Sequence, residues 1–180
     1  MKKFDCIFLD RDGTLNPDPG YINNILDYNF YDFTLPALKM MSKNHNRFCI
    51  VTNQSGVARG LIPINNLNTI NAFIRKKFIE NNIDLLDIYM SFDLPDNASN
   101  NRKPGSGMFL KAKKEHNLNL SKCLMVGDSI SDMEAGKKLG MKTMLVLTGE
   151  GEKTLRNFQH KNFISYFADN IYEGFKQICH

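Results

Sequence analysis

Short apolar runs alternate along the chain with longer segments in which apolar residues recur at helical spacing. Six runs of strand length predict strands at residues 4–9, 48–51, 88–92, 123–126, 144–147 and about 163–167. The helical segments predict one helix that starts near Thr34, three that cover residues 64–83, 108–117 and 131–139, and one at the C-terminus. Strands that alternate with helices indicate an α/β fold, with a doubly wound, mostly parallel sheet and helices on both faces.

Two residues are predicted to mark helix ends. Thr34 can cap the first predicted helix, because its side-chain oxygen can accept a hydrogen bond from the first turn. Gly140 directly follows the helix over residues 131–139, at a position where glycine commonly ends a helix.

Composition and charge narrow the class of protein without naming a function. The length of 180 residues suits one domain over residues 1–180 with a full hydrophobic core. No apolar run approaches the roughly 20 residues that span a bilayer, and the first apolar segment is too short for a signal peptide. We therefore expect a cytoplasmic protein with no membrane partner. Its four cysteines are far apart in the sequence, which favours buried reduced thiols. The net charge of +4 is compatible with an anionic substrate and with weak nucleic-acid contact.

The candidate chemistry lies at the carboxyl ends of the predicted strands, where ligands bind in folds of this kind. Asp10 and Asp12 directly follow the first strand. Two neighbouring carboxylates repel each other, and a bound Mg²⁺, which prefers oxygen ligands, relieves the repulsion. One carboxylate can attack phosphorus while the other transfers a proton. The alternative is a solvated, aspartate-rich turn.

The second and third strands are followed by residues able to bind anions. Thr52 is the first polar residue after the second strand, and its hydroxyl can donate to a phosphoryl oxygen. Asn53 can instead cap the turn that follows. Arg59 has a fork of donors that can grip a second anionic group. Arg102 and Lys103 end the polar segment after the third strand, although such a pair is usually solvated surface.

The fourth strand is followed by two further carboxylates. Asp128 comes after a buried run and a glycine, and it is a candidate metal ligand. Asp132 lies about one turn into the next helix, where it can simply favour the helix N-terminus. Each cluster alone is weak to moderate support for a site. Their order at consecutive strand ends is specific: D-x-D-G-T, then Thr, then Lys, then GD-x-x-x-D.

These segments, FLDRDGT, IVTN, RKP and GDSISD, resemble the four motifs of the haloacid dehalogenase superfamily of phosphohydrolases, over nearly the whole chain. The resemblance implies a Mg²⁺-dependent phosphatase that works through an aspartyl-phosphate. It assigns Asp10 as the nucleophile, Asp12 as the general acid/base, Thr52 and Lys103 as phosphoryl-binding residues, Asp10, the Asp12 backbone carbonyl and Asp128 as Mg²⁺ ligands, and Asp132 as support for the site. Because the superfamily's ATPases have threonine in place of Asp12, this residue indicates turnover.

One branch of the superfamily is especially similar. FLDRDGTLN, PGYI and TNQSGVARG together resemble the D-glycero-D-manno-heptose 1,7-bisphosphate 7-phosphatases, which act in nucleotide-activated heptose biosynthesis. That resemblance implies a small phosphorylated sugar as partner, with Asn53, Arg59 and Arg102 contacting the sugar or its retained phosphate. The gaps after the first and third strands are too short for a large cap domain, which needs roughly 40 residues. We therefore expect an open site and a monomer.

The segment before RKP departs from the pattern of this branch, many members of which have a zinc-binding loop there. The corresponding positions are Ser91, Asp93, Ser99 and Asn101, and none is cysteine or histidine. Structural zinc is bound by four good nitrogen or sulfur ligands, so no zinc is expected. We expect prolines and turn hydrogen bonds to hold this loop.

Two other enzyme classes and one non-enzyme class stay open. Histidinol-phosphate phosphatases share FLDRDGT and TNQ, and polynucleotide 3′-phosphatases share D-x-D-G-T and a TNQ-x-G stretch. The weak basic charge and the lack of an aromatic-and-basic strip argue against nucleic acid as a partner. A phospho-acceptor signalling module also uses an aspartate on such a sheet, but it would keep its phosphate, which Asp12 argues against.

Overall fold

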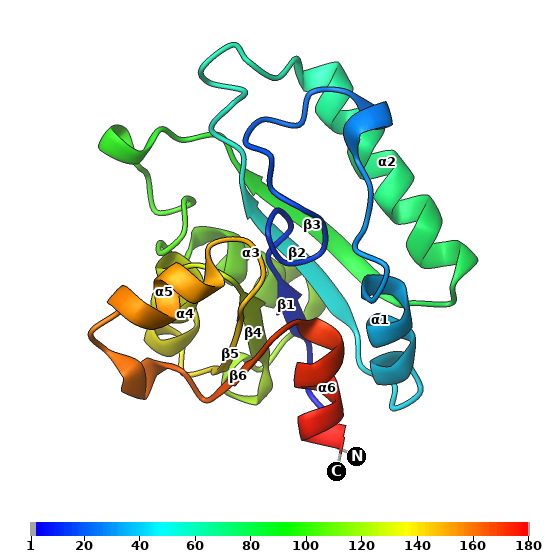
Figure 1. Cartoon of the computed structure of the whole chain (residues 1–180), viewed down its shortest axis with the longest axis vertical. Helices are drawn as coiled ribbons and strands as arrows, with labels where there is room; N and C mark the ends of the chain where they lie inside the picture. Colours follow the sequence, from blue (N-terminus) through cyan, green and yellow to red (C-terminus); the bar gives the residue numbers. More distant parts are fainter. Residues whose placement is uncertain (1–2, 180) are drawn as a thin grey trace.

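The computed structural model describes residues 3–179, whose six strands form one parallel sheet (Figure 1). The strands are β1 (Ile7–Leu9), β2 (Phe48–Asn53), β3 (Leu85–Ser91), β4 (Leu124–Gly127), β5 (Lys142–Val146) and β6 (Tyr166–Ala168). Their order in the sheet is β3-β2-β1-β4-β5-β6, and each adjacent pair is parallel. Strands β2 and β3 lie on one side of β1, and β4, β5 and β6 lie on the other. The strand order therefore reverses between β1 and β4, which is the switch point of the sheet.

Helices cover both faces of this sheet, as the doubly wound prediction requires (Figure 1). They are α1 (Thr34–Ser42), α2 (Ile64–Glu80), α3 (Gly107–His116), α4 (Ile130–Lys138), α5 (Gly151–Asn157) and α6 (Ile171–Cys179). Four short 3₁₀ turns connect them: η1 (Ile25–Asp27), η2 (Pro95–Asn97), η3 (Leu120–Lys122) and η4 (Lys161–Phe163). The expected single domain over residues 1–180 stays a prediction, which the single sheet favours; residues 1, 2 and 180 lie outside the described part.

The hydrophobic core lies on both sides of the sheet because strand side chains point alternately to its two faces. Ile7 and Leu9 of β1 pack with α1, α2 and α6, whereas Phe8 packs with α3 and α4. Burial on both faces explains why the central strands are continuous apolar runs rather than alternating ones. Among residues 3–179, no helix is both long and apolar enough to cross a membrane.

The predicted helices at residues 108–117 and 131–139 are displaced by one residue, and larger differences concern the cap of α1 and the end of α2. Thr34 does not cap α1: Phe33 occupies the N-cap position, and the Thr34 hydroxyl instead donates to the carbonyl oxygen of Leu15 at 2.7 Å. Helix α2 ends at Glu80 rather than at residue 83. The reason is Asn82, which adopts a left-handed conformation (φ 53°) that asparagine tolerates and that ends a helix.

Strand β1 begins at Ile7 rather than at residue 4, and further differences concern β3, the last strand and one short helix. Strand β3 begins at Leu85 rather than at residue 88, because a polar residue is tolerated on an edge strand and Asp87 extends the strand without breaking it. Phe163 belongs to η4, so the last strand is Tyr166–Ala168. The short helix α5 was not predicted at all.

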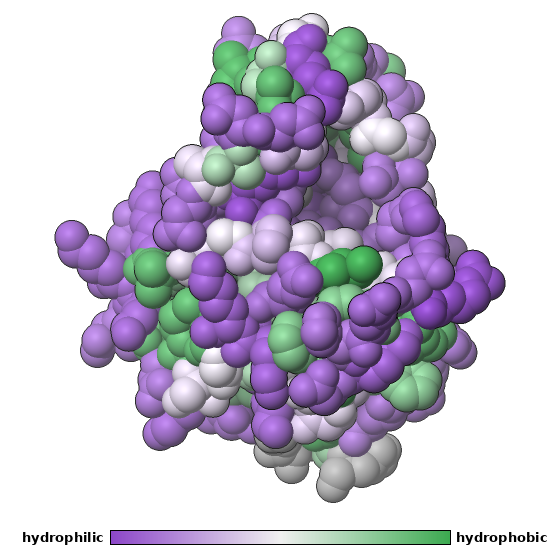
Figure 2. All heavy atoms as spheres, turned by 90° about the vertical axis from the view of Figure 1, so that its left-hand side faces the viewer, coloured by the Kyte–Doolittle hydropathy of each residue, from purple (hydrophilic) through white to green (hydrophobic). Residues whose placement is uncertain are grey.

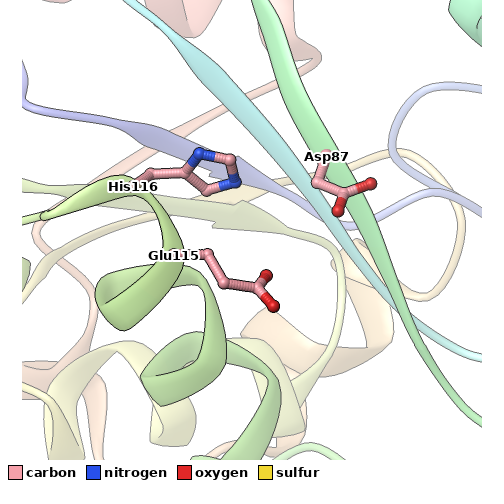
Figure 3. A group of neighbouring side chains, drawn as sticks. All are labelled: Asp87, Glu115 and His116. Atoms are coloured by element: carbon pink, nitrogen blue, oxygen red, sulfur yellow. The ribbon is translucent and has the colours of Figure 1, made fainter.

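A polar cluster fastens the free edge of the sheet at β3 to the neighbouring helices (Figure 3). The Tyr89 hydroxyl donates to Glu115 Oε2 at 2.7 Å and lies 3.1 Å from His116 Nε2. Asp87 pairs with Arg75 of α2, and Figure 3 shows Glu115 and His116 of α3 beside Asp87. Because each carboxylate already has a cation or a hydroxyl as partner, the cluster's role is to join α2 and α3 to β3.

Candidate active site

The predicted site residues converge at the carboxyl ends of β1, β2 and β4, where a cavity of about 400 Å³ opens. Six of them line it: Asp10, Asp12, Thr52, Asn53, Lys103 and Asp128. Arg59, Arg102 and Asp132 lie outside the lining. Figure 2 shows that the surface is hollowed below the upper lobe of the molecule, which in Figure 1 contains the loops that follow β1 and β2.

Lys103 is fixed beside this cavity by two carboxylates. Its ammonium nitrogen lies 2.6 Å from Asp10 Oδ1 and 2.6 Å from Asp132 Oδ1. The second oxygen of Asp132 accepts from the Ser129 hydroxyl at 2.6 Å and from the Ser129 backbone N–H at 3.1 Å, at the start of α4. Asp132 is 0% exposed, whereas Asp10 is 8% exposed and lines the cavity. Asp10 is therefore the carboxylate that a ligand can reach, and Asp132 contacts Lys103 from the protein interior.

Burial and mutual repulsion change the protonation of these groups. Burial raises the pKa of Asp10 to about 7, although the positive charge of Lys103 opposes the change. Burial, with the negative charges of Asp10 and Asp132, raises the pKa of Asp128 to about 8. Burial alone would lower the pKa of Lys103, but the two carboxylates beside it raise that pKa above its ordinary value. Lys103 therefore stays protonated, whereas the positive charge of this one residue does not offset the effect of burial and repulsion on the carboxylates around it.

Close backbone approach forms a cradle around Asp128. A Cβ atom on Gly13 or on Gly149 would lie 2.1 Å from Asp128 Oδ2, and both glycines have positive φ. The same oxygen accepts the backbone N–H of Glu150 at 2.8 Å, and the Thr148 hydroxyl donates to the Gly13 carbonyl at 2.5 Å. Only glycine fits at these two positions, so the loops after β1 and β5 hold Asp128 in place.

This arrangement fits a divalent cation with oxygen ligands. Asp10, Asp128 and Asp132 offer carboxylate oxygens that lie within 4.8 Å of one another. Asp132 already binds Lys103 and Ser129, so Asp10 and Asp128 are the carboxylates available to a metal. Burial and repulsion between carboxylates raise their pKa values, a bound cation would oppose both effects, and Mg²⁺ prefers such oxygen donors.

Three residues that were not predicted to belong to the site hold the Asp12 carboxylate. Arg11 Nε donates to Asp12 Oδ1 at 2.9 Å, and Arg11 Nη2 donates to Oδ2 at 2.7 Å. Asn16 donates to Oδ1 at 2.9 Å, and Gln54 donates to Oδ2 at 2.7 Å. Four donors therefore fix the orientation of this carboxylate. Arg11 is only 1% exposed. Its burial was not predictable from the sequence DRDG, in which three of the four residues are charged.

Thr52 and Asn53, at the end of β2, use their side chains differently. The Thr52 hydroxyl accepts from Gln54 Nε2 at 2.9 Å, which leaves its own hydrogen free to donate to a ligand. The Asn53 amide holds the backbone of Lys103: its Nδ2 donates to the Lys103 carbonyl at 3.2 Å, and its Oδ1 accepts the Lys103 N–H at 3.0 Å. Asn53 thus joins β2 to the loop that carries Lys103.

Hydrogen bonds join the four residues that correspond to the zinc ligands of the similar branch, Ser91, Asp93, Ser99 and Asn101. Ser99 donates its N–H and its hydroxyl to the Asp93 carboxylate, at 2.9 and 2.5 Å. The Ser91 hydroxyl accepts the Asp93 N–H at 3.3 Å, and the Ser99 hydroxyl accepts the Asn101 N–H at 3.1 Å. These residues supply oxygen atoms that are already engaged, whereas structural zinc requires nitrogen or sulfur ligands. The predicted turn hydrogen bonds in this loop are confirmed.

The two arginines predicted to bind substrate lie near each other but outside the cavity lining. Arg102 is half-buried, and its Nη1 donates to the Asp93 carbonyl oxygen at 2.9 Å. Burial lowers the pKa of Arg102, and the charge of Arg59 acts in the same direction. The guanidinium of the exposed Arg59 is therefore close enough to repel that of Arg102. An anion bound between the two groups would relieve this repulsion.

Known proteins are similar to this chain in sequence and in fold. A family model described as HAD-hydrolase-like matches residues 100–173. The D-glycero-beta-D-manno-heptose-1,7-bisphosphate 7-phosphatase of Yersinia pestis is 35% identical over 160 residues, which cover 82% of this chain and 85% of that protein. The chain belongs to this family of haloacid dehalogenase-like phosphatases.

Two further members of the family cover almost all of the chain. The D-glycero-alpha-D-manno-heptose-1,7-bisphosphate 7-phosphatase of Campylobacter jejuni is 31% identical over 170 residues, covering 93% of this chain and 98% of that protein. The D,D-heptose 1,7-bisphosphate phosphatase from B. bronchiseptica, crystallised with magnesium and phosphate, superimposes with a TM-score of 0.89 at 28% identity, covering 99% and 98%. The predicted family, fold class and phosphatase class are confirmed.

In this haloacid dehalogenase-like phosphatase the cavity also has lining residues that were not predicted: Asp18, Tyr21, Ile62, Ser129, Ser131 and Glu150. Tyr21 belongs to PGYI, a segment that indicated family resemblance but no role in the site. Glu150 follows β5, whose carboxyl end lies at the same edge of the sheet as the other site loops. The signal for Glu150 was available, because every parallel strand of the sheet contributes a loop to this edge.

Proposed function

We propose that this protein is a Mg²⁺-dependent phosphatase that removes the 7-phosphate from D-glycero-D-manno-heptose 1,7-bisphosphate. The observation that carries the proposal is the pairing of Asp10 with Lys103 at 2.6 Å, beside Asp128, at the cavity of a chain whose relatives are named for this reaction. A nucleophile, a fixed cation and a second metal-ligating carboxylate are what phosphoryl transfer to a carboxylate requires.

The first step is attack by Asp10 on phosphorus. Asp10 is the accessible carboxylate of the buried group, and Lys103 is positioned to neutralise charge on the phosphoryl oxygens. As the bond between phosphorus and the sugar oxygen breaks, protonated Asp12 gives its proton to that oxygen, which leaves a free hydroxyl and an aspartyl-phosphate. The Thr52 hydroxyl, whose hydrogen is not used within the protein contacts described, can donate to a third phosphoryl oxygen.

The second step returns the enzyme to its starting state. Asp12, now ionised, takes a proton from water, which attacks the aspartyl-phosphate and releases inorganic phosphate. The four donors around Asp12 hold its carboxylate in a fixed orientation. The proton taken in this step is the one that Asp12 gives to the next sugar oxygen. Mg²⁺, held by Asp10, Asp128 and the Asp12 backbone carbonyl, would supply further positive charge for the phosphoryl group.

A bisphosphate also needs cations for the phosphate that is not cleaved. Arg59 and Arg102 lie within reach of each other's charge, and Tyr21, which lies near Arg102, lines the cavity. Two such guanidinium groups are suited to a second phosphate, because arginine binds phosphate oxygens through paired donors. We further propose that the enzyme is a cytoplasmic monomer that acts on a small phosphorylated sugar and not on nucleic acid. The absence of a disulfide among its four cysteines supports the location.

Phosphate release from three substrates tests the proposed function. Heptose 1,7-bisphosphate, as separate α and β anomers, histidinol phosphate and a 3′-phosphorylated oligonucleotide would each be assayed with Mg²⁺ and with EDTA. We expect Mg²⁺-dependent release to be fastest from one of the heptose anomers. Faster release from the oligonucleotide or from histidinol phosphate would contradict the substrate, and no release from any of them would contradict the enzyme class.

A further inference from the structure

The loop between β3 and α3 is organised around Asp93. The Asp93 carboxylate accepts the N–H and the hydroxyl of Ser99, while the Asp93 N–H donates to Ser91 and the Ser99 hydroxyl accepts from Asn101. We call these four residues the Asp93 hub. The pKa of Asp93 lies below its ordinary value because the Ser99 hydroxyl donates to its carboxylate. The hub therefore depends on an ionised aspartate whose oxygen ties together residues six positions apart.

Arg102 rests on this hub through both its side chain and its backbone. Its Nη1 donates to the Asp93 carbonyl oxygen at 2.9 Å, and its backbone N–H donates to the Ser99 carbonyl oxygen at 3.3 Å. The negative charge of Asp93 also acts on the Arg102 guanidinium. One nitrogen of the guanidinium fork is used in this way, which leaves the other donors of a group with five N–H bonds for a ligand.

The neighbouring Lys103 is held from the opposite side. The Asn53 amide binds the N–H and the carbonyl of Lys103, and the Gly105 N–H donates to the Arg102 carbonyl at 2.6 Å. A Cβ atom on Gly105 would lie 2.3 Å from the Asn100 carbonyl oxygen, so the backbone here is closely packed. The two adjacent cations thus have separate supports: β2 holds Lys103, and the Asp93 hub holds Arg102.

Stability alone does not account for the hub. Ser99 and Asn101 are exposed, and hydrogen bonds and charge pairs at a solvated surface contribute little to the free energy of unfolding. Their effect is instead to limit the positions of a long side chain. An arginine that is already fixed loses less conformational entropy when it binds a phosphate, so a fixed Arg102 binds more tightly.

We propose that Asp93 is a positioning residue that holds Arg102 for the phosphate of the substrate that is not cleaved. This inference rests on the proposed function, because it assumes a substrate with two phosphates. Asp93 acts through the loop and does not touch the reacting atoms. Loss of the hub should therefore weaken the binding of a bisphosphate and leave the chemical step, carried by Asp10, Asp12 and Lys103, as it was.

The kinetic test compares Asp93→Ala with Asp96→Ala. Asp96 is an exposed carboxylate three residues further along the same loop, so its loss matches the change in charge and in loop composition. We expect Asp93→Ala to raise KM for the heptose bisphosphate about tenfold, as loss of a well-placed charged hydrogen bond does, with kcat changed less than about twofold. Hydrolysis of p-nitrophenyl phosphate, which has a single phosphate, should be unchanged in both variants.

A second measurement needs no substrate. Backbone hydrogen exchange at Ser99, Asn101 and Arg102 should accelerate in Asp93→Ala and stay at the wild-type rate in Asp96→Ala. Ser99→Ala should accelerate exchange at the same amides, because Ser99 is the other half of the hub. The double variant, Asp93→Ala with Ser99→Ala, should show no further acceleration, since two residues that act through one contact are not additive.

The outcomes separate this inference from the proposed function. Unchanged exchange in Asp93→Ala, or fast exchange with an unchanged KM for the bisphosphate, would overturn the role of Asp93 while leaving the enzyme's substrate intact. A kcat that fell as steeply as KM rose would also overturn it, because the residue would then act on the chemical step. A wild-type enzyme that released no phosphate from heptose bisphosphate would overturn the proposed function, and with it the assignment of Arg102 to a second phosphate.

Discussion

Asp10 must remain a nucleophile in surroundings that oppose its negative charge. Burial raises its pKa to about 7, and the neighbouring carboxylates of Asp132 and Asp12 act in the same direction. Lys103, 2.6 Å away, is the described group that opposes them. A buried ammonium that lost its partners would be costly, so the pairing with Asp10 and Asp132 keeps Lys103 charged while Lys103 keeps Asp10 reactive.

Asp10→Asn should abolish turnover without unfolding the protein. The amide is close in shape to the carboxylate but cannot form an aspartyl-phosphate, so we expect kcat to fall more than about a thousandfold. Because the ionised Asp10 is repelled by neighbouring carboxylates, its replacement by a neutral group should leave the melting temperature unchanged or higher. Single-turnover phosphate release and circular dichroism melting would measure the two effects.

Asp84→Asn is a suitable control for this variant. Asp84 is exposed and precedes β3, at the amino ends of the strands and away from the cavity. It should keep wild-type activity. Wild-type turnover by Asp10→Asn would remove Asp10 as the nucleophile, and a large fall in melting temperature would mean that its role is structural.

The residues of the site were predictable where a strand end fixes their direction, whereas Lys103, far beyond the end of β3, was predicted from the resemblance of RKP to a superfamily motif. Asp10 and Asp128 follow buried parallel strands whose carboxyl ends share one edge of the sheet, so both were predicted at that edge, and the pairing of β1 with β4 brings them together. The partners of Asp12 were not predictable in this way, because Arg11 had to be folded back and buried before it could contact its neighbour. Which way a charged side chain turns depends on packing from segments far away in the sequence.

At the scale of elements, buried strands and long amphipathic helices were predictable because burial leaves a pattern in the sequence. Elements at the margins were not. Strand β3 lies at the edge of the sheet, so its first residues are only half-buried and include Asp87. Helix α5 has seven residues and begins where Gly151 packs closely against the β5 backbone: a Cβ atom there would lie 1.8 Å from the Val146 carbonyl oxygen. A single close contact of this kind leaves no periodic pattern of apolar residues in the sequence, so it does not predict a helix.

Gly136 should be required for the packing of α4 against the sheet. A Cβ atom at this position would lie 2.6 Å from the Thr143 methyl group and 3.0 Å from Met125 Cβ. Thr143 cannot move easily, because it is fully buried and its hydroxyl is bound to the backbone of Phe163. We expect Gly136→Ala to lower the free energy of unfolding by about 1 to 3 kcal/mol, although alanine favours helix by about 1 kcal/mol.

Urea unfolding would measure this effect, with Lys138→Ala as the matched control. Lys138 is exposed in the last turn of the same helix, and its replacement should change stability by less than about 0.5 kcal/mol. A Gly136→Ala variant more stable than wild type would mean that helix propensity outweighs the close contact with β4 and β5.

At the scale of the whole molecule, the parallel sheet gathers like charges at one edge. The loops after β1 and β4 bring Asp10 and Asp128 together beside Asp132, all within 4.8 Å. The same topology places the compensating cation far away in the sequence, because Lys103 comes from the loop after β3. One lysine for three carboxylates leaves a deficit of positive charge at the site, so the folded state should bind a divalent cation more tightly than the unfolded chain does.

Binding of Mg²⁺ should therefore stabilise the whole fold. A ligand that binds only the folded state at a hundred times its Kd adds about 2.7 kcal/mol, which for a chain of this size corresponds to a rise in melting temperature of roughly 5 to 10 °C. Thermal unfolding with saturating MgCl₂ and with EDTA would measure the rise, and activity should disappear in EDTA. In Asp128→Asn the Mg²⁺-dependent rise should be lost, while the melting temperature in EDTA stays equal to wild type or exceeds it, because one of the repelling charges is gone. An equal rise in wild type and Asp128→Asn would place the stabilising cation elsewhere in the molecule.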